Sequence, residues 1–127
     1  MDSIELINYN TGIKIIIKEK WCNLFFVHNE EIRLLGSNTV KKVLKPLMLS
    51  FLPAKNRKTY GISGKELFEI MYLSEPHSII LGEKKDNNMN MYQIDANGEL
   101  NFLLSINEET QNNWAKIIND YSPLKEF

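Results

Sequence analysis

The chain has 127 residues, of which 43% are hydrophobic and 24% are charged, an ordinary composition for a soluble globular protein. This length suffices for a core of its own, so we expect residues 1–127 to form one domain. A single cysteine, Cys22, excludes an intramolecular disulfide bond and is typical of a reducing compartment. The first residues lack the pattern of a signal peptide, and no apolar run approaches the length of a membrane span. We therefore expect a cytoplasmic protein without membrane contact.

The net charge of −1 conceals an uneven distribution along the chain. Residues 41–65 include seven basic residues and no acidic residue, whereas residues 66–127 include eleven acidic and four basic residues. Such an asymmetry bears on partners and on association rates rather than on the fold.

Short apolar runs in the first forty residues predict four strands. Two isoleucine-rich runs flank Asn10-Thr11-Gly12, and Asn and Gly tolerate the positive φ of a hairpin turn. Gly36-Ser37-Asn38 is expected to end the last run. The four predicted strands are 4–9, 13–18, 23–28 and 32–35. The third, 23–28 (NLFFVH), is expected to be buried on both faces.

Between Thr39 and Leu52 the apolar residues recur at helical spacing, which predicts a helix. Ser37, Asn38 or Thr39 can cap its first turn, because a side-chain oxygen accepts the free N–H groups there. Pro46 is expected to kink the helix and Pro53 to stop it. The polar, basic segment 54–64 is predicted to be a loop.

Residues 65–106 contain four apolar runs separated by three turn signals, the pattern of an antiparallel meander. The run 99–106 alternates most clearly, with Leu100, Phe102, Leu104 and Ile106 on one face. A closing helix is expected over 108–121, capped by Asn107. The predicted strands of the meander are 67–73, 78–81, 89–94 and 99–106.

The order of these elements predicts an α+β fold. Two antiparallel β-meanders are each followed by a helix (ββββα–ββββα), and the apolar stripes of the helices pack on the sheets. A meander needs one covered face to be stable, and in this arrangement each of the two meanders has one face covered by a helix.

No set of residues specifies a catalytic or metal chemistry, so we expect neither an enzyme nor a cofactor. The segment Gly61–Lys65 has only part of a phosphate-loop motif and precedes a strand, which favours a structural turn. His28 and His77 lack further ligands at zinc spacing. Cys22 is expected to be buried rather than nucleophilic.

Two surfaces remain as candidates for binding. Acidic residues lie at the turns of the second meander, where they can attract a basic protein partner such as a nuclease toxin domain. Alternatively, the basic segment 41–58 can follow the phosphates of single-stranded nucleic acid. The first hypothesis rests on Glu75, Glu83, Asp86, Asp95 and Glu99, and the second on Lys55, Arg57 and Lys58.

In its small size, its richness in Asn, Ile and Lys, its lack of a catalytic set and its expected α+β fold, the chain resembles the immunity proteins of bacterial contact-dependent growth inhibition and related polymorphic toxin systems. The resemblance implies specific binding to one cognate toxin domain, with its active site or substrate access blocked. The predicted order of elements also resembles the Whirly-type fold of single-strand DNA-binding proteins, which would suit the nucleic-acid alternative.

Overall fold

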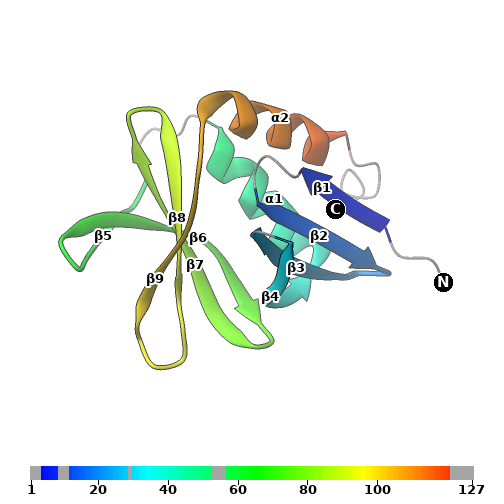
Figure 1. Cartoon of the computed structure of the whole chain (residues 1–127), viewed down its shortest axis with the longest axis horizontal. Coiled ribbons are helices and arrows are strands. Elements are labelled where there is room, and N and C mark those ends of the chain that lie inside the picture. The colour runs from blue at the N-terminus through cyan, green and yellow to red at the C-terminus, as the bar shows by residue number, and fades with distance from the viewer. Residues whose placement is uncertain (1–3, 9–11, 29, 53–56, 121–127) are drawn as a thin grey trace.

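The computed structural model describes residues 4–8, 12–28, 30–52 and 57–120 (Figure 1). It has two antiparallel sheets and two helices, so the α+β class is confirmed. Consecutive strands pair within each sheet, in the orders β1-β2-β3-β4 and β5-β6-β7-β8-β9. The elements are β1 (Ile4–Asn8), β2 (Ile13–Lys18), β3 (Trp21–His28), β4 (Glu31–Thr39), α1 (Val40–Phe51), β5 (Tyr60–Ile62), β6 (Lys65–Ser74), β7 (His77–Lys85), β8 (Asn88–Ile94), β9 (Leu100–Ile106) and α2 (Glu108–Asn119).

The second sheet has five strands, so the predicted ββββα–ββββα order is wrong by one strand. The additional strand, β5, lies in the segment predicted to be a loop. It has three residues, is interrupted by Gly61 and pairs only with the start of β6. A strand this short has no hydrophobic alternation that a sequence pattern can reveal.

Strand β4 continues through Gly36-Ser37-Asn38, which were predicted to end it. Ser37 and Asn38 are buried, and their side chains are paired: the Ser37 hydroxyl donates to the Asn23 side chain, and Asn38 Nδ2 donates to the Tyr72 carbonyl at 3.0 Å. At Gly36 an added Cβ would lie 2.7 Å from the Cβ of Leu73 on β6. These polar and small residues join the two sheets instead of forming a turn.

The second meander differs from its prediction at two further places. Strand β7 extends to Lys85, and the turn to β8 contains only Asp86 and Asn87, both at positive φ, as two-residue hairpins require. Strand β9 has an irregular register opposite Met91 and Tyr92. The predicted alternation is therefore broken, because Leu103 is buried and Phe102 is exposed.

Both helices form where the apolar periodicity placed them. Asn107 caps α2 as predicted, with its side-chain oxygen accepting from the Thr110 N–H at 2.8 Å. The N-cap of α1 is Thr39, but its side chain makes no capping hydrogen bond. Pro46 lies inside α1 as predicted, and Pro53 lies outside the described residues.

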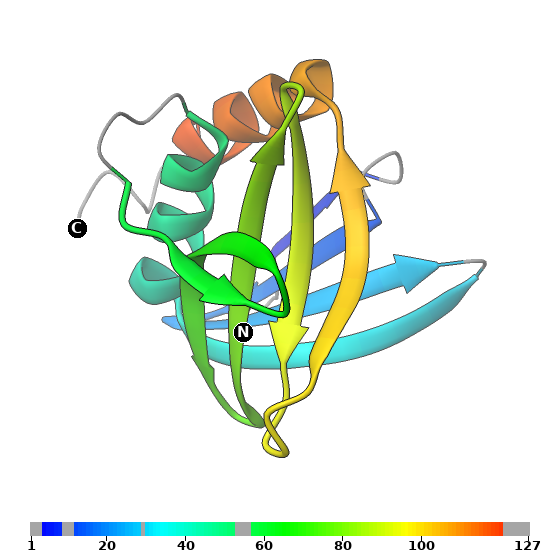
Figure 2. The ribbon, with the colours of Figure 1, turned by 90° about the vertical axis from the view of Figure 1, so that its left-hand side faces the viewer.

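One hydrophobic cluster joins both halves of the chain. It takes alternate residues from the inner face of β2, such as Ile15, the apolar stripe of α1, the inner face of the second sheet and Trp114 of α2. Figure 2 shows the strands of the second sheet crossing in front of β3 and β4, with α2 across the top and α1 along the left side. Cys22 is fully buried in this cluster, as expected.

Candidate functional site

The five predicted acidic residues do not form one patch. In the order β6-β7-β8-β9, the β6–β7 and β8–β9 turns lie at one end of the sheet and the β7–β8 turn at the other. Glu75 and Glu99 are exposed near the first end, and Asp86 is exposed at the second. A single basic surface on a partner would therefore reach only some of these carboxylates.

Two of the five carboxylates take part in hydrogen bonds within the protein. Asp95 Oδ1 accepts from the N–H groups of Asn97 and Glu99 at 2.9 and 3.1 Å, which organises the β8–β9 turn. Glu83 Oε1 accepts from Asn90 at 3.0 Å and from the Tyr92 hydroxyl at 3.3 Å. The Asn90 bond lowers the pKa of Glu83, so this carboxylate stays ionised on the sheet.

The predicted basic residues are also separated. Lys55 lies outside the described residues. Lys58 is exposed, with its Nζ 5.3 Å from the centre of the Tyr60 ring. Arg57 lies between two hollows of about 440 and 460 Å³, and both hollows are also lined by Lys84. The fold thus adds Lys84, from the acidic half of the sequence, to the basic segment.

A projecting hairpin carries two of the large hydrophobic side chains that are exposed among the described residues. We call residues 25–28 of β3, the turn residue Glu30 and residues 31–34 of β4 the hairpin arm. The register of β2 on β3 ends at Phe26, and the Val27 N–H donates to the Gly12 carbonyl at 2.7 Å. Figure 2 shows the end of the hairpin reaching beyond the neighbouring strands. Ile32 and Leu34 are 55% and 43% exposed. Four consecutive residues of β4, from Glu31 to Leu34, are exposed, so neither face of this strand is covered here.

The two faces of the hairpin arm have different chemistry, because successive side chains of a strand point to opposite faces. Cross-strand pairs place Phe25 with Leu34 and Val27 with Ile32, which makes one face entirely apolar. The other face pairs Phe26 with Arg33 and His28 with Glu31.

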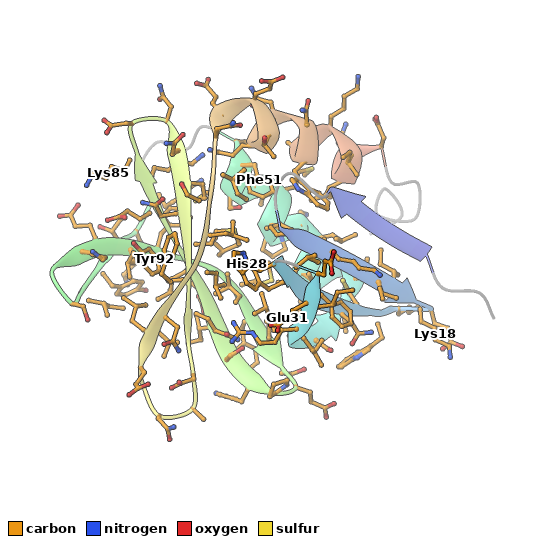
Figure 3. All side chains as sticks on the ribbon, in the orientation of Figure 1. Lys18, His28, Glu31, Phe51, Lys85 and Tyr92 are labelled. Atoms are coloured by element: carbon orange, nitrogen blue, oxygen red, sulfur yellow. The ribbon has the colours of Figure 1, made fainter. Side chains whose placement is uncertain are left out.

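The second face of the arm borders a hollow of about 480 Å³ against β9. The rings of Phe26 and His28 stack at 5.8 Å, and the Arg33 guanidinium lies 5.8 Å from the Phe26 ring centre. Phe102 of β9, which is 59% exposed, lines the same hollow. Figure 3 labels His28 and Glu31 at the β3–β4 hairpin, away from Lys85. The hollow thus brings together aromatic, cationic and acidic side chains from β3, β4 and β9.

The described structure also places the residues that were considered for catalysis or ligand binding, namely Cys22, His77 and the segment Gly61–Lys65. Burial raises the pKa of the Cys22 thiol to about 12, so it is not a thiolate at neutral pH. His77 lies beside the β6–β7 turn, where Nδ1 is 2.7 Å from the Tyr72 hydroxyl. Gly64 and Lys65 belong to the turn and strand that follow β5, as the structural interpretation of Gly61–Lys65 predicted. Within the described part of the chain, no group of three or more His, Cys, Asp or Glu residues is placed to hold a metal ion.

The hairpin arm was not predicted from the sequence to be a binding surface. The run NLFFVH was interpreted as a strand buried on both faces, but Val27 is only partly buried and His28 is exposed. Alternation and composition look alike in a covered strand and in a projecting one, and only the missing neighbours reveal the difference.

No family model matches the chain, and comparisons with curated proteins and with solved structures identify no similar protein. Of the described helices, none is long and apolar enough to cross a membrane.

Proposed function

We propose that this protein is a cytoplasmic immunity protein that neutralises a cognate basic toxin domain by direct binding, and that the hairpin arm is its contact surface. The observation that carries the proposal is the exposure of Ile32 and Leu34 on the segment of β4 from Glu31 to Leu34, all of whose residues are exposed. Isolated exposed apolar residues are common, but a contiguous apolar face on a projecting element is typical of a protein interface.

The composition of the arm fits a partner with a basic surface. Its apolar face ends at a tip that includes Glu30 and Glu31, both exposed. Interfaces commonly have an apolar centre and a charged rim, where complementary charge accelerates association. A nuclease domain suits this tip because its substrate groove is positive. The acidic turns with Glu75 and Glu99 provide further negative charge on the same molecule.

The aromatic hollow on the other face of the arm can receive a side chain of the partner. Phe26, Arg33 and Phe102 border it, and aromatic and arginine residues are enriched among those that dominate binding energies. Contact on both faces would allow the partner to enclose the hairpin.

The test is protection from toxicity. The gene that precedes this one is examined for a large secreted protein, and the C-terminal domain of that protein is produced in a susceptible bacterium with and without the present chain. We expect growth to be restored only when both are produced together and to be lost with the double variant Ile32→Gln/Leu34→Gln. Continued growth inhibition by a toxic domain in the presence of the folded wild-type protein would contradict the proposal.

A further inference from the structure

A second surface lies on different elements from the hairpin arm. The hollow of about 440 Å³ beside β5 and β6 is lined by Arg57, Thr59, Lys65, Glu66, Lys84 and Lys85, and we call it the cationic groove. Four of its lining residues are cations and two, Glu66 and Glu83, are carboxylates. The excess positive charge comes from three separate segments of the chain, which only the fold brings together.

Arg57 is held in place by neutral groups. Its Nη2 donates to the carbonyls of Leu49 and Leu52, at 3.3 and 3.4 Å, at the end of α1. Its guanidinium lies 4.1 Å from the centre of the Phe68 ring. These contacts fix the cation without neutralising it, and the guanidinium has further N–H donors for a ligand.

Lys84 is held in a similar way from the other side. Its Nζ donates to Gln111 Oε1, and the buried Gln111 is fixed in turn by donating to the carbonyls of Asn87 and Ile106, at 3.0 and 2.8 Å. Burial and the nearby charge of Arg57 both lower the pKa of Lys84, while Glu108 opposes them weakly. Two like charges are thus kept close together, and a bound anion would relieve their repulsion.

The hydrogen bond from Asn90 and, more weakly, the charges of Lys65 and Lys85 lower the pKa of the Glu83 carboxylate. These two lysines are therefore partly compensated, and Arg57 and Lys84 are the cations that remain available. Glu83 accepts hydrogen bonds from Asn90 and Tyr92. Among the described residues, the hydrogen bonds of Arg57 and Lys84 go to carbonyl and amide oxygens rather than to a carboxylate. Gly64, at the rim, has open space where a Cβ would be, so a ligand can approach the backbone there.

We propose that the cationic groove is a binding site for a phosphoryl group. A tetrahedral oxyanion can accept from a guanidinium, an ammonium and the Thr59 hydroxyl at once, and charge-assisted bonds of this kind are the strong ones. The group can belong to a small phosphorylated molecule or to the backbone of single-stranded nucleic acid. For the second source, the exposed Tyr60 beside Lys58 offers a ring on which a base can stack.

The experiment is an NMR titration of the ¹⁵N-labelled full chain with pyrophosphate at low ionic strength, against sodium chloride of equal ionic strength. We expect saturable shifts at Gly64 and Lys65. Lys84→Gln and Lys65→Gln should each raise the dissociation constant about tenfold, as expected for loss of a charge-assisted hydrogen bond. The matched control is Lys45→Gln, on the exposed face of α1, which should change it less than about twofold.

The source of the phosphate is distinguished by a second titration with a 12-nucleotide single-stranded DNA. Competition with pyrophosphate, together with weakening by Tyr60→Ala, assigns the groove to nucleic acid. Pyrophosphate binding without competition assigns it to a small phosphorylated ligand. The proposal is overturned if pyrophosphate causes no saturable shift, or if Lys45→Gln weakens binding as much as Lys84→Gln. This inference goes beyond the inhibitor function. The variant Ile32→Gln/Leu34→Gln should leave pyrophosphate binding unchanged, so the phosphoryl-site proposal and the toxin-binding proposal can each be refuted without affecting the other.

Discussion

Replacement of Gln111 by Met should test how the fold connects α2 to the β7–β8 hairpin. Met has a similar length but lacks the amide, so the carbonyls of Ile106 and Asn87 lose their donor and Lys84 loses its acceptor. The bond to Ile106 is buried, and leaving a buried acceptor without a partner costs about 1–3 kcal/mol. The bond to Asn87 is only partly buried and should add less. We expect the free energy of unfolding to fall by about 2–3 kcal/mol.

The assay is urea unfolding followed by tryptophan fluorescence, because Trp114 is fully buried and should report loss of the core. With a urea m-value of about 2 kcal/mol per molar, the midpoint should fall by about 1–1.5 M. Asn113→Met, at an exposed position of the same helix, is the matched control and should change stability by less than about 0.5 kcal/mol. Equal midpoints for the two variants would refute the role assigned to Gln111.

Three further predictions concern stability. Burial raises the folded-state pKa of Cys22 to about 12, so the contribution of its thiol to stability is fully present below the unfolded pKa of about 8.5 and is lost as the pH rises towards 12. Between these values the free energy of unfolding of the wild type should fall by about 1.4 kcal/mol per pH unit more than that of Cys22→Ala. Parallel plots of the free energy of unfolding against pH for the two proteins, from about pH 8 to 10, would contradict this. Gly82→Ala would place a Cβ 2.7 Å from Phe68 Cζ and should lower the stability measured by thermal unfolding by about 1–3 kcal/mol. The control Gly61→Ala places a Cβ where nothing lies within 4 Å, so its stability should not change. Similar melting temperatures of the two variants would argue against the packing described around Gly82. Asp95→Ala removes the acceptor of the β8–β9 turn and should cost about 1 kcal/mol in urea unfolding, and no loss would show that these turn bonds are dispensable.

Periodicity sufficed to predict the two helices and most strands, because alternation and helical spacing describe how a local segment meets the core. Periodicity was insufficient wherever the conformation of a segment depends on contacts with residues that are distant in sequence. Strand β4 continues through Ser37 and Asn38 because Asn23 and Tyr72 satisfy their polar groups, and Gly36 is required by the approach of Leu73. None of these partners is close in sequence.

The candidate sites show the same limit. Linear charge counts placed Lys84 in the acidic half of the chain, yet the fold sets it beside Arg57 at the shared wall of two hollows. The counts also treated Asp95 and Glu83 as surface charges available to a partner, although both carboxylates accept hydrogen bonds within the protein. A residue's place along the chain therefore did not predict whether its charge is available for binding.

The most direct test of the proposed function is the affinity of the purified protein for its toxin domain, measured by calorimetry with two matched double variants. Ile32→Gln/Leu34→Gln changes the hairpin arm, and Leu49→Gln/Leu52→Gln changes two leucines at the end of α1 that are 49% and 39% exposed. Loss of two interface side chains should cost about 2 kcal/mol, so the arm variant should bind about 30-fold more weakly, while the α1 variant should bind like the wild type. Equal affinity of the wild type and the arm variant would contradict the proposal that the hairpin arm binds the partner.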